Sequence, residues 1–289
     1  MGSVVRLRAF AKVNYVLAVL GLRSDGYHEV ATVLQSISLA DELDVELANG
    51  GFELAVEPEG SEVGPPEKNT VFKAWSQLGE TTGEELPVKV RLRKKIPSGA
   101  GLGGASADAA AALVGINRLF GLGLGGEELR EIGGRIGADV PFCISGGTAL
   151  GEGIGGILTP LPAPPAHKLL VVKPQKSAGT ARIYRAYDNS PVRTAAVDPA
   201  IKALYGGDLN ALAAALDNDL AATTGALVPE VSDYEKELLE SGALGANMSG
   251  TGTAVYGVFA ENEASLAAER LRTRFAGIYE PVSNGVEIL

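Results

Sequence analysis

The sequence predicts an α+β protein built from two domains. Strand-like and helix-like segments are mixed along its 289 residues without the regular alternation of a parallel α/β fold. Asn49-Gly50-Gly51 joins two strand-like segments and indicates a hairpin. The proline-rich stretch 159–165, TPLPAPP, can continue neither a helix nor a strand and is the best candidate for a boundary. We therefore expect one domain over residues 1–160 and a second over residues 161–289.

Apolar periodicity predicts the individual elements. Strands are expected at 4–7, 16–20, 43–47, 52–57, 88–92, 169–172 and 253–259, with a short separate segment at 11–14 between the first two. Helices are expected at 71–78, from the glycine-rich loop to about 120, and at 127–136, 180–187, 209–216, 232–239 and 263–272. Asn69 or Thr70 can cap the first of these helices, and Gly137 can end the helix at 127–136.

The composition indicates a well-cored globular protein and argues against polyanionic partners. Hydrophobic residues make up 46% of the chain, and the net charge is -10. An acidic surface repels nucleic acid and anionic membranes, so any phosphate site must supply its own positive field. The single cysteine, Cys143, excludes an internal disulfide and suits a reducing compartment. No stretch has the length of a signal peptide core or a membrane span, so we expect a cytoplasmic protein.

Residues 97–113, PSGAGLGGASADAAAAL, are the most informative stretch of the chain. Gly99, Gly101, Gly103 and Gly104 let the backbone approach a ligand closely, because no Cβ stands in the way. The helix that follows would direct its free N–H groups and its partial positive charge back at the loop. The stretch therefore predicts a site for an anion, most often a phosphate.

Three other interpretations of this loop are weaker. A dinucleotide-binding fold needs a fully buried strand before the loop, whereas residues 88–92 alternate between polar and apolar. A Walker A loop needs Lys-Ser/Thr after its last glycine, and here Ala105-Ser106 follows Gly104. A glycine turn without a ligand does not explain four glycines clustered at a helix entry.

Several other residues could carry chemistry, each with a plainer alternative. Asp139 is either a carboxylate held beside a substrate hydroxyl or a solvated turn residue. Lys12 is either a cation positioned for a phosphate or an edge-strand charge. Tyr27 and His28 are either surface residues or a pair that reads a heterocyclic base. The turn 248–252, MSGTG, either cradles an anion or shapes a loop, and no metal site is expected.

Taken together, these segments resemble the GHMP kinase superfamily over nearly the whole chain. The resemblance runs through AKVNYVLAVLGLRSDGYHEVATVLQSISLADEL, PSGAGLGGASADAA, GADVPFCISGGTALGEGIGGILTPLP and MSGTGTAVYGVF. It implies a two-domain kinase fold, with an N-terminal domain like domain 2 of ribosomal protein S5 and a ferredoxin-like C-terminal domain. At position 107 similar sequences carry a serine whose hydroxyl could touch phosphate or magnesium, and this chain has Ala107.

The resemblance also implies an activity: transfer of a phosphoryl group from ATP, with Mg²⁺ bound mainly by its phosphates. The acceptor would be the 2-hydroxyl of a cytidine diphosphate-linked methylerythritol, a small-molecule substrate. Lys12 and Asp139 would be catalytic, and Asn14 would assist in the same pocket. Tyr27, His28 and Tyr184 would hold the cytosine. The ATP phosphates would be bound by Pro97, Gly99, Ala100, Gly101, Leu102, Gly103, Gly104 and Ser106.

Two alternatives stay open at this point. A sister kinase of the superfamily acting on another small alcohol, such as mevalonate or homoserine, would have no use for residues that read a base. A phosphate-binding module that has lost catalysis would have no need of both Lys12 and Asp139.

Overall fold

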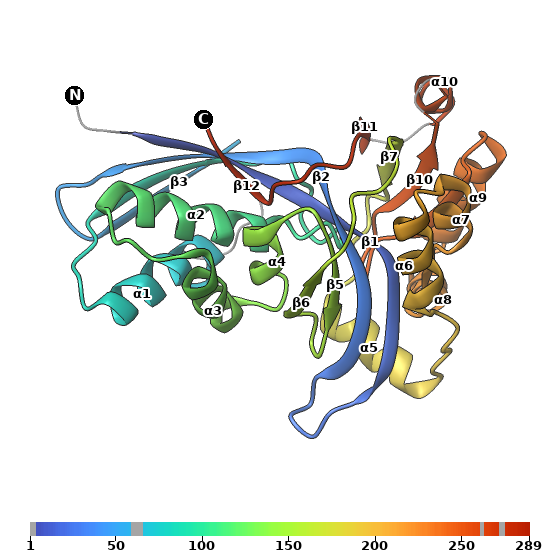
Figure 1. Ribbon diagram of the computed structural model, residues 1–289, viewed down its shortest axis with the longest axis horizontal. Helices are drawn as coiled ribbons and strands as arrows, with labels where there is room; N and C mark the ends of the chain where they lie inside the picture. The colour runs from blue at the N-terminus through green and yellow to red at the C-terminus, as the bar shows by residue number, and fades with distance from the viewer. Residues whose placement is uncertain (1–3, 59–65, 261–262, 272–274) are drawn as a thin grey trace.

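The computed structural model describes residues 4–58, 66–260, 263–271 and 275–289, and these form two β-sheets with helices packed against them (Figure 1). The first sheet has the order β12-β1-β2-β4-β3, with β5 on β2, β6 on β5 and β8 on β1. Its strands are β1 (Val5–Leu22), β2 (His28–Leu47), β3 (Phe52–Glu57), β4 (Val88–Arg93), β5 (Thr148–Glu152), β6 (Ile157–Pro160), β8 (Asp217–Asn218) and β12 (Val286–Ile288). The second sheet has the order β11 (Phe275–Tyr279), β7 (Lys168–Lys173), β10 (Val255–Phe259) and β9 (Gly245–Met248).

The helices form two groups in chain order (Figure 1). With the first sheet lie η1 (Pro66–Lys68), α1 (Thr70–Thr82), α2 (Gly104–Phe120), α3 (Gly126–Ile136) and α4 (Val140–Ser145). In the second half lie α5 (Thr180–Asn189), α6 (Val197–Gly206), α7 (Leu209–Ala214), α8 (Ala221–Leu227), α9 (Glu230–Glu240) and α10 (Ala264–Ala268). Of the second group, α6 also contacts β1 and β2 of the first sheet. The sequence did not predict α4, α6 or α8. The expected helix 263–272 is shorter than predicted, and its last residue lies outside the described ones.

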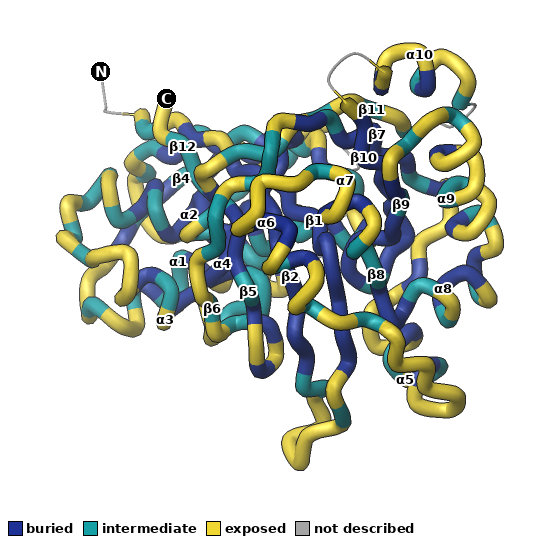
Figure 2. The backbone as a smooth tube through the Cα atoms, turned by 45° about the vertical axis from the view of Figure 1, so that its right-hand side comes forward, coloured by how far each residue is buried: buried dark blue, intermediate teal, exposed yellow. Residues whose placement is uncertain are grey.

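The first strand is longer than its sequence suggests. We expected two strands separated by residues 11–14, but β1 runs unbroken for 18 residues. Residues 11–14 pair with β2, and the register of this pairing shifts on either side of them, between Phe10 and Ala11 and between Asn14 and Val16. Most of β1 and β2 is buried, and their exposed residues lie at the tip of the hairpin and at the opposite ends of the two strands, at Arg6, Arg8 and Leu47 (Figure 2). A strand buried on both faces loses the alternation by which a strand is normally recognised.

The predicted hairpin between residues 43–47 and 52–57 is wrong. β4 lies between β2 and β3, antiparallel to β2 and parallel to β3. Charge favours this order, because basic residues of β4 meet acidic residues on both neighbours. Arg93 Nη2 lies 2.6 Å from Asp44 Oδ2 on β2, and Arg91 Nε lies 3.6 Å from Glu57 Oε1 on β3.

The helix ends confirm two predictions. Asn69 caps α1 by accepting a hydrogen bond from the Val71 N–H at 2.8 Å. Gly137 ends α3, as expected, although with extended backbone rather than in the left-handed conformation.

The two halves of the chain meet along β1. The prediction that 159–165 continues no regular element is wrong for Thr159 and Pro160, which belong to the edge strand β6. β8 and β12 come from the second half of the chain, yet both pair with β1 in the first sheet.

His167 is buried in the connection between β6 and β7. Its Nδ1 lies 2.7 Å from the Pro165 carbonyl, and therefore carries the proton and donates. Its Nε2 lies 3.2 Å from the Tyr15 hydroxyl of β1, from which it accepts. Burial lowers the pKa of His167 and outweighs the opposite effect of the Pro165 carbonyl.

Because His167 is buried, we expect the free energy of unfolding to depend on pH, and we expect this dependence to be weaker in His167→Gln. Below about pH 6.5 the unfolded chain binds a proton that the folded chain excludes, so stability falls as pH drops through that value, until the folded-state pKa is passed. We expect the wild-type protein to lose on the order of 1 kcal/mol more than His167→Gln between about pH 7 and pH 5. Gln can still accept from Tyr15 but does not titrate. Scanning calorimetry over this range measures the difference, and parallel curves would contradict the prediction.

Candidate active site

A cleft of about 1180 Å³ brings together residues from both halves of the chain. One end is formed by the glycine-rich loop 97–103 and the start of α2. The middle holds Lys12, Asn14 and Asp139. The other end is lined by the tip of the β1–β2 hairpin and by α5. The predicted site residues therefore line one continuous cleft.

The glycines of the loop are required by the protein's own atoms. Gly99, Gly101 and Gly103 have φ of 60°, 75° and 73°, a region that other residues rarely adopt. A Cβ on Gly101 would collide with the Ser249 carbonyl oxygen, and one on Gly103 would lie 2.9 Å from Lys12 Cγ. The Cβ directions of Gly101 and Gly103 are thus occupied by neighbouring protein atoms, so the packing of the loop itself requires glycine at these two positions.

Three hydrogen bonds fix the carbonyl groups of the loop. The Ala100 carbonyl accepts from the Ala254 N–H at 3.0 Å, and the Leu102 carbonyl accepts from the Lys12 N–H at 2.9 Å. The Gly101 carbonyl accepts from the Ser249 hydroxyl at 2.9 Å. The loop runs directly into α2, whose N-cap is Gly103 and whose first N–H groups have no partner within the helix. This arrangement suits an anion at the entry of α2.

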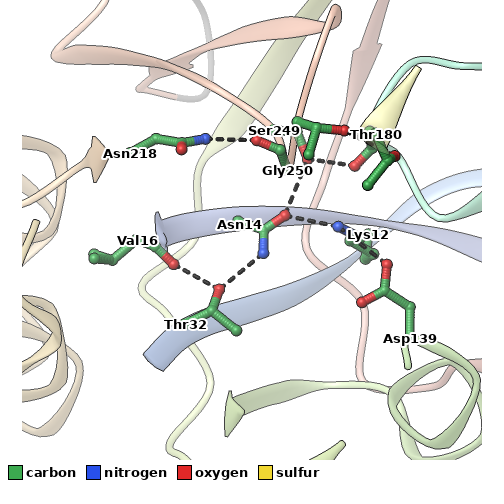
Figure 3. Close-up of polar contacts among 11 residues, drawn as sticks. Lys12, Asn14, Val16, Thr32, Asp139, Thr180, Asn218, Ser249 and Gly250 are labelled. Carbon is green, nitrogen blue, oxygen red and sulfur yellow. Dashed lines mark hydrogen bonds and ion pairs between the residues drawn. The ribbon is translucent and has the colours of Figure 1, made fainter. Parts of the chain in front are cut away.

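Lys12 lies in the inner wall of the cleft and has polar partners on two sides (Figure 3). Its Nζ donates to Asn14 Oδ1 at 2.7 Å and lies 3.4 Å from Asp139 Oδ2. The Lys12 side chain is 4% exposed and the Asp139 side chain 35%, so a ligand can reach the carboxylate from the cleft. The structure excludes the interpretation of Lys12 as an edge-strand charge.

Asn14 is held in turn by two hydroxyl groups (Figure 3). Its Nδ2 donates to Thr32 Oγ1 at 2.8 Å, and that hydroxyl donates to the Val16 carbonyl at 2.6 Å. Ser249 Oγ lies 3.5 Å from Asn14 Oδ1. Because both ends of the Asn14 amide are engaged, its oxygen is oriented toward Lys12. Sequence reasoning identified the turn that carries Ser249 but missed Thr32.

Beneath the loop, sequence reasoning also missed a buried cluster of one lysine and two carboxylates. Lys94 Nζ donates to Asp41 Oδ2 at 2.5 Å and to Asp108 Oδ2 at 2.6 Å. Burial opposes the charged form of Lys94, but the two carboxylates outweigh it and raise its pKa. The cluster ties the first turns of α2 to β2 and to the end of β4.

Ser106 lines the cleft, and Ala107 does not. Ala107 is fully buried in the hydrophobic core under α2. The expectation that a hydroxyl at position 107 would touch phosphate is therefore wrong for this chain, because that position faces the core.

At the other end of the cleft, α5 holds His28. The His28 ring stacks on the Tyr184 ring, with centroids 4.4 Å apart and planes at 21°. The Nε2 atom of His28 lies 2.8 Å from Asp188 Oδ1. Burial raises the pKa of Tyr184 to about 12. Tyr27 is 61% exposed at the hairpin tip and makes no ring contact with the other described residues. The structure therefore brings His28 and Tyr184 together and leaves Tyr27 apart.

Two family profiles match the chain. GHMP kinases N terminal domain matches residues 69–147, and GHMP kinases C terminal matches residues 200–277. A protein of Moorella thermoacetica named 4-diphosphocytidyl-2-C-methyl-D-erythritol kinase is 43% identical over 282 residues, 96% of this chain and 96% of the relative. The chain belongs to the GHMP kinase family. This GHMP kinase is accordingly an ATP-dependent kinase of a small molecule.

Other relatives of this GHMP kinase agree in sequence and fold. A protein with the same name from Caldanaerobacter subterraneus subsp. tengcongensis is 39% identical over 289 residues, 99% of each chain. A crystal structure of 4-(cytidine 5'-diphospho)-2C-methyl-D-erythritol kinase superposes with a TM-score of 0.79 at 33% identity, covering 96% of this chain and 98% of that one. A homoserine kinase from Cytophaga hutchinsonii superposes with a TM-score of 0.77 at 19% identity, covering 99% and 97%, and shares the fold alone.

Two kinds of feature are absent from the part of the chain that the structure describes. No helix there combines the length and apolar character needed to span a membrane. The same residues contain no group of three or more side chains suited to hold a metal ion.

The contact between Gly101 and Ser249 predicts a large difference between two glycine substitutions. Gly101 and Gly121 both have positive φ, but an added Cβ at Gly121 meets nothing within 4 Å. We expect Gly121→Ala to cost about 1 kcal/mol of stability from backbone strain, and Gly101→Ala to cost roughly 3 kcal/mol, because the second site also forces two backbones apart. Denaturant unfolding measures both values. Equal costs would show that the two backbones separate freely.

Proposed function

We propose that this chain transfers a phosphoryl group from ATP to the 2-hydroxyl of 4-diphosphocytidyl-2-C-methyl-D-erythritol. The observation that carries the proposal is the continuity of the cleft, in which an anion-binding helix start, a Lys–Asp pair and an aromatic pocket follow one another. Relatives 39–43% identical over nearly their whole length bear the name of the kinase for this substrate.

The ATP phosphates would lie at the start of α2. The loop from Pro97 through Gly99, Ala100, Gly101, Leu102, Gly103 and Gly104, with Ser106, lines that end of the cleft. Lys94 is already balanced by two carboxylates, so the positive field for the phosphates comes from Lys12 and the N–H groups of α2. Mg²⁺ would neutralise phosphate charge when bound. The phosphates would supply most of its ligands, with the Ser106 hydroxyl as one candidate from the protein.

Lys12 and Asp139 would divide the chemistry between them. Asp139 would accept the proton of the substrate hydroxyl. The oxygen of that hydroxyl would bond to the transferred phosphorus as the bond between this phosphorus and ADP breaks. Lys12, held by Asn14, would stabilise the charge on the acceptor oxygen and on the group in transfer. The placement of Lys12 in the wall and of Asp139 at the surface of the cleft supports this division.

The far end of the cleft would hold the cytosine. The exposed ring of Tyr27 would stack on the base, and the His28 imidazole would hydrogen-bond to it. The His28 ring already covers one face of the Tyr184 ring. Tyr184 would therefore contact the base with the part of its ring that His28 leaves free, or would act indirectly by holding His28 in place. Residues 1–160 would then supply most of the ATP site, and residues 161–289 would supply α5 and the 248–252 turn. We place the reaction in the cytoplasm, because a chain with a single cysteine needs no oxidising compartment to form disulfides.

A sister kinase for mevalonate or homoserine is the second candidate. Its support is the shared fold of the homoserine kinase, at 19% identity. The aromatic end of the cleft favours a substrate with a heterocyclic base instead. A module without catalysis is disfavoured because Lys12 and Asp139 face each other at 3.4 Å.

Release of ADP in the presence of each alcohol tests the substrate. We expect turnover with the cytidine-linked substrate, none with mevalonate or homoserine, and competition by cytidine diphosphate. Turnover with a small alcohol and no competition by the nucleotide would favour the sister kinase.

Replacement of either catalytic residue should strongly lower turnover without abolishing ATP binding. We expect Asp139→Asn to lower kcat about 10²–10⁴-fold, because the carboxylate that accepts the proton is lost. Lys12→Met should lower kcat to a similar extent through loss of charge stabilisation. Calorimetric titration with ATP is the control: both variants should still bind it, Lys12→Met more weakly because Lys12 contributes to the positive field at the phosphates. Near-normal kcat in both would contradict the assigned roles.

A further inference from the structure

His28 is the point at which the β1–β2 hairpin meets α5. It is the first residue of β2 and contacts three residues of one helix. Asp188 Oδ1 lies 2.8 Å from its Nε2, Tyr184 stacks on its face, and Tyr187 lies edge-on with centroids 6.5 Å apart and planes at 80°. The ring of His28 therefore has a fixed plane and a fixed direction.

The contact with Asp188 also fixes the position of the imidazole proton. A carboxylate can only accept a hydrogen bond, so Nε2 of the neutral imidazole must carry the proton. Nδ1 is then left with a lone pair. Among the described residues Nδ1 has no protein partner, and His28 lines the cleft. Nδ1 of His28 is thus available as a hydrogen-bond acceptor for a ligand in the cleft.

We propose that Asp188 is a positioning residue that makes this site select a pyrimidine with an amino group at its 4-position. An acceptor at Nδ1 pairs with the 4-amino group of cytosine but faces a lone pair on the 4-carbonyl oxygen of uracil. Discrimination of this kind depends on leaving a polar group of the wrong base unpaired and is worth about tenfold in affinity. The inference rests on the proposed function, because it concerns the base of the proposed substrate.

A purely structural role for Asp188 makes a different prediction. If the carboxylate only joined α5 to the hairpin, its loss would weaken binding of every nucleotide equally. If it sets the tautomer, its loss changes the preference between bases. The ratio of affinities for two bases separates the two roles, because cytidine and uridine diphosphates carry the same ribose and phosphates.

The binding experiment compares cytidine diphosphate with uridine diphosphate as competitors of the wild-type enzyme and of Asp188→Asn. An Asn amide can donate to Nε2, which releases the proton to Nδ1 and allows it to pair with the uracil carbonyl. We expect the preference for cytidine diphosphate to fall about tenfold in Asp188→Asn, with a higher KM and a nearly unchanged kcat. Asp188→Glu, which keeps the carboxylate, should restore most of the preference. Asp198→Asn, which removes a charge from an exposed position of α6, should leave the preference unchanged.

Nitrogen NMR of the imidazole reads the tautomer directly. The chain has two histidines, His28 and His167, so His167→Gln assigns the remaining signals. At about pH 8 we expect the protein to show Nε2 protonated and Nδ1 unprotonated at His28, and Asp188→Asn to show a mixture of both tautomers.

Two results would overturn the inference. One is a preference for cytidine diphosphate that is unchanged in Asp188→Asn, as it is when both nucleotides bind equally more weakly, and the other is a proton on Nδ1 in the wild-type protein. If the wild-type enzyme phosphorylates the cytidine-linked substrate in spite of such a result, the proposed function stands and only the role of Asp188 falls. If the wild-type enzyme neither binds cytidine diphosphate nor phosphorylates that substrate, both fall.

Discussion

The cleft depends on a short segment of β1 whose backbone hydrogen-bonds to loops and side chains. β12 pairs with Leu7–Ala9 and β8 pairs with Val16–Leu17. Between them the Lys12 N–H donates to the glycine-rich loop. The Asn14 and Tyr15 carbonyls accept from Tyr256 and Asn247 of the second sheet at 2.7 and 3.1 Å. Backbone groups in a buried strand must find partners, and here those partners are the elements that build the site.

The same segment explains why the lysine can be buried. A cation in a protein interior is stable only if it has hydrogen-bond acceptors and a nearby negative charge. Asn14 supplies the acceptor for Lys12 and Asp139 the charge, whereas Lys94 has two carboxylates of its own. One lysine is thus tied into the scaffold beneath α2, and the other retains a reachable carboxylate beside it.

The features predicted from sequence were those with local signals. Clustered glycines before a helix, a lone lysine in an apolar strand and an aspartate between a helix end and an apolar segment can each be seen within a few residues. The order of β2, β4 and β3 could not be predicted, because the local turn signal competes with charge pairing to a strand reached only after α1. Asp41 and Asp188 were missed because their partners Lys94 and His28 lie 53 and 160 residues away in the chain. The reason for the loop glycines was also hidden, since Ser249, which Gly101 contacts, belongs to the other half of the chain.

The pairing of β12 with β1 has a consequence for the order in which the protein forms. Leu7 lies opposite Ile288, so one edge of the first sheet is completed by residues that leave the ribosome some 280 positions later. During synthesis that edge of β1 has no strand to cover it, and an open apolar edge can pair with another chain. A nascent chain of this topology is therefore most exposed to misassembly through β1, the strand that carries Lys12, until β12 has emerged from the ribosome and can pair with it.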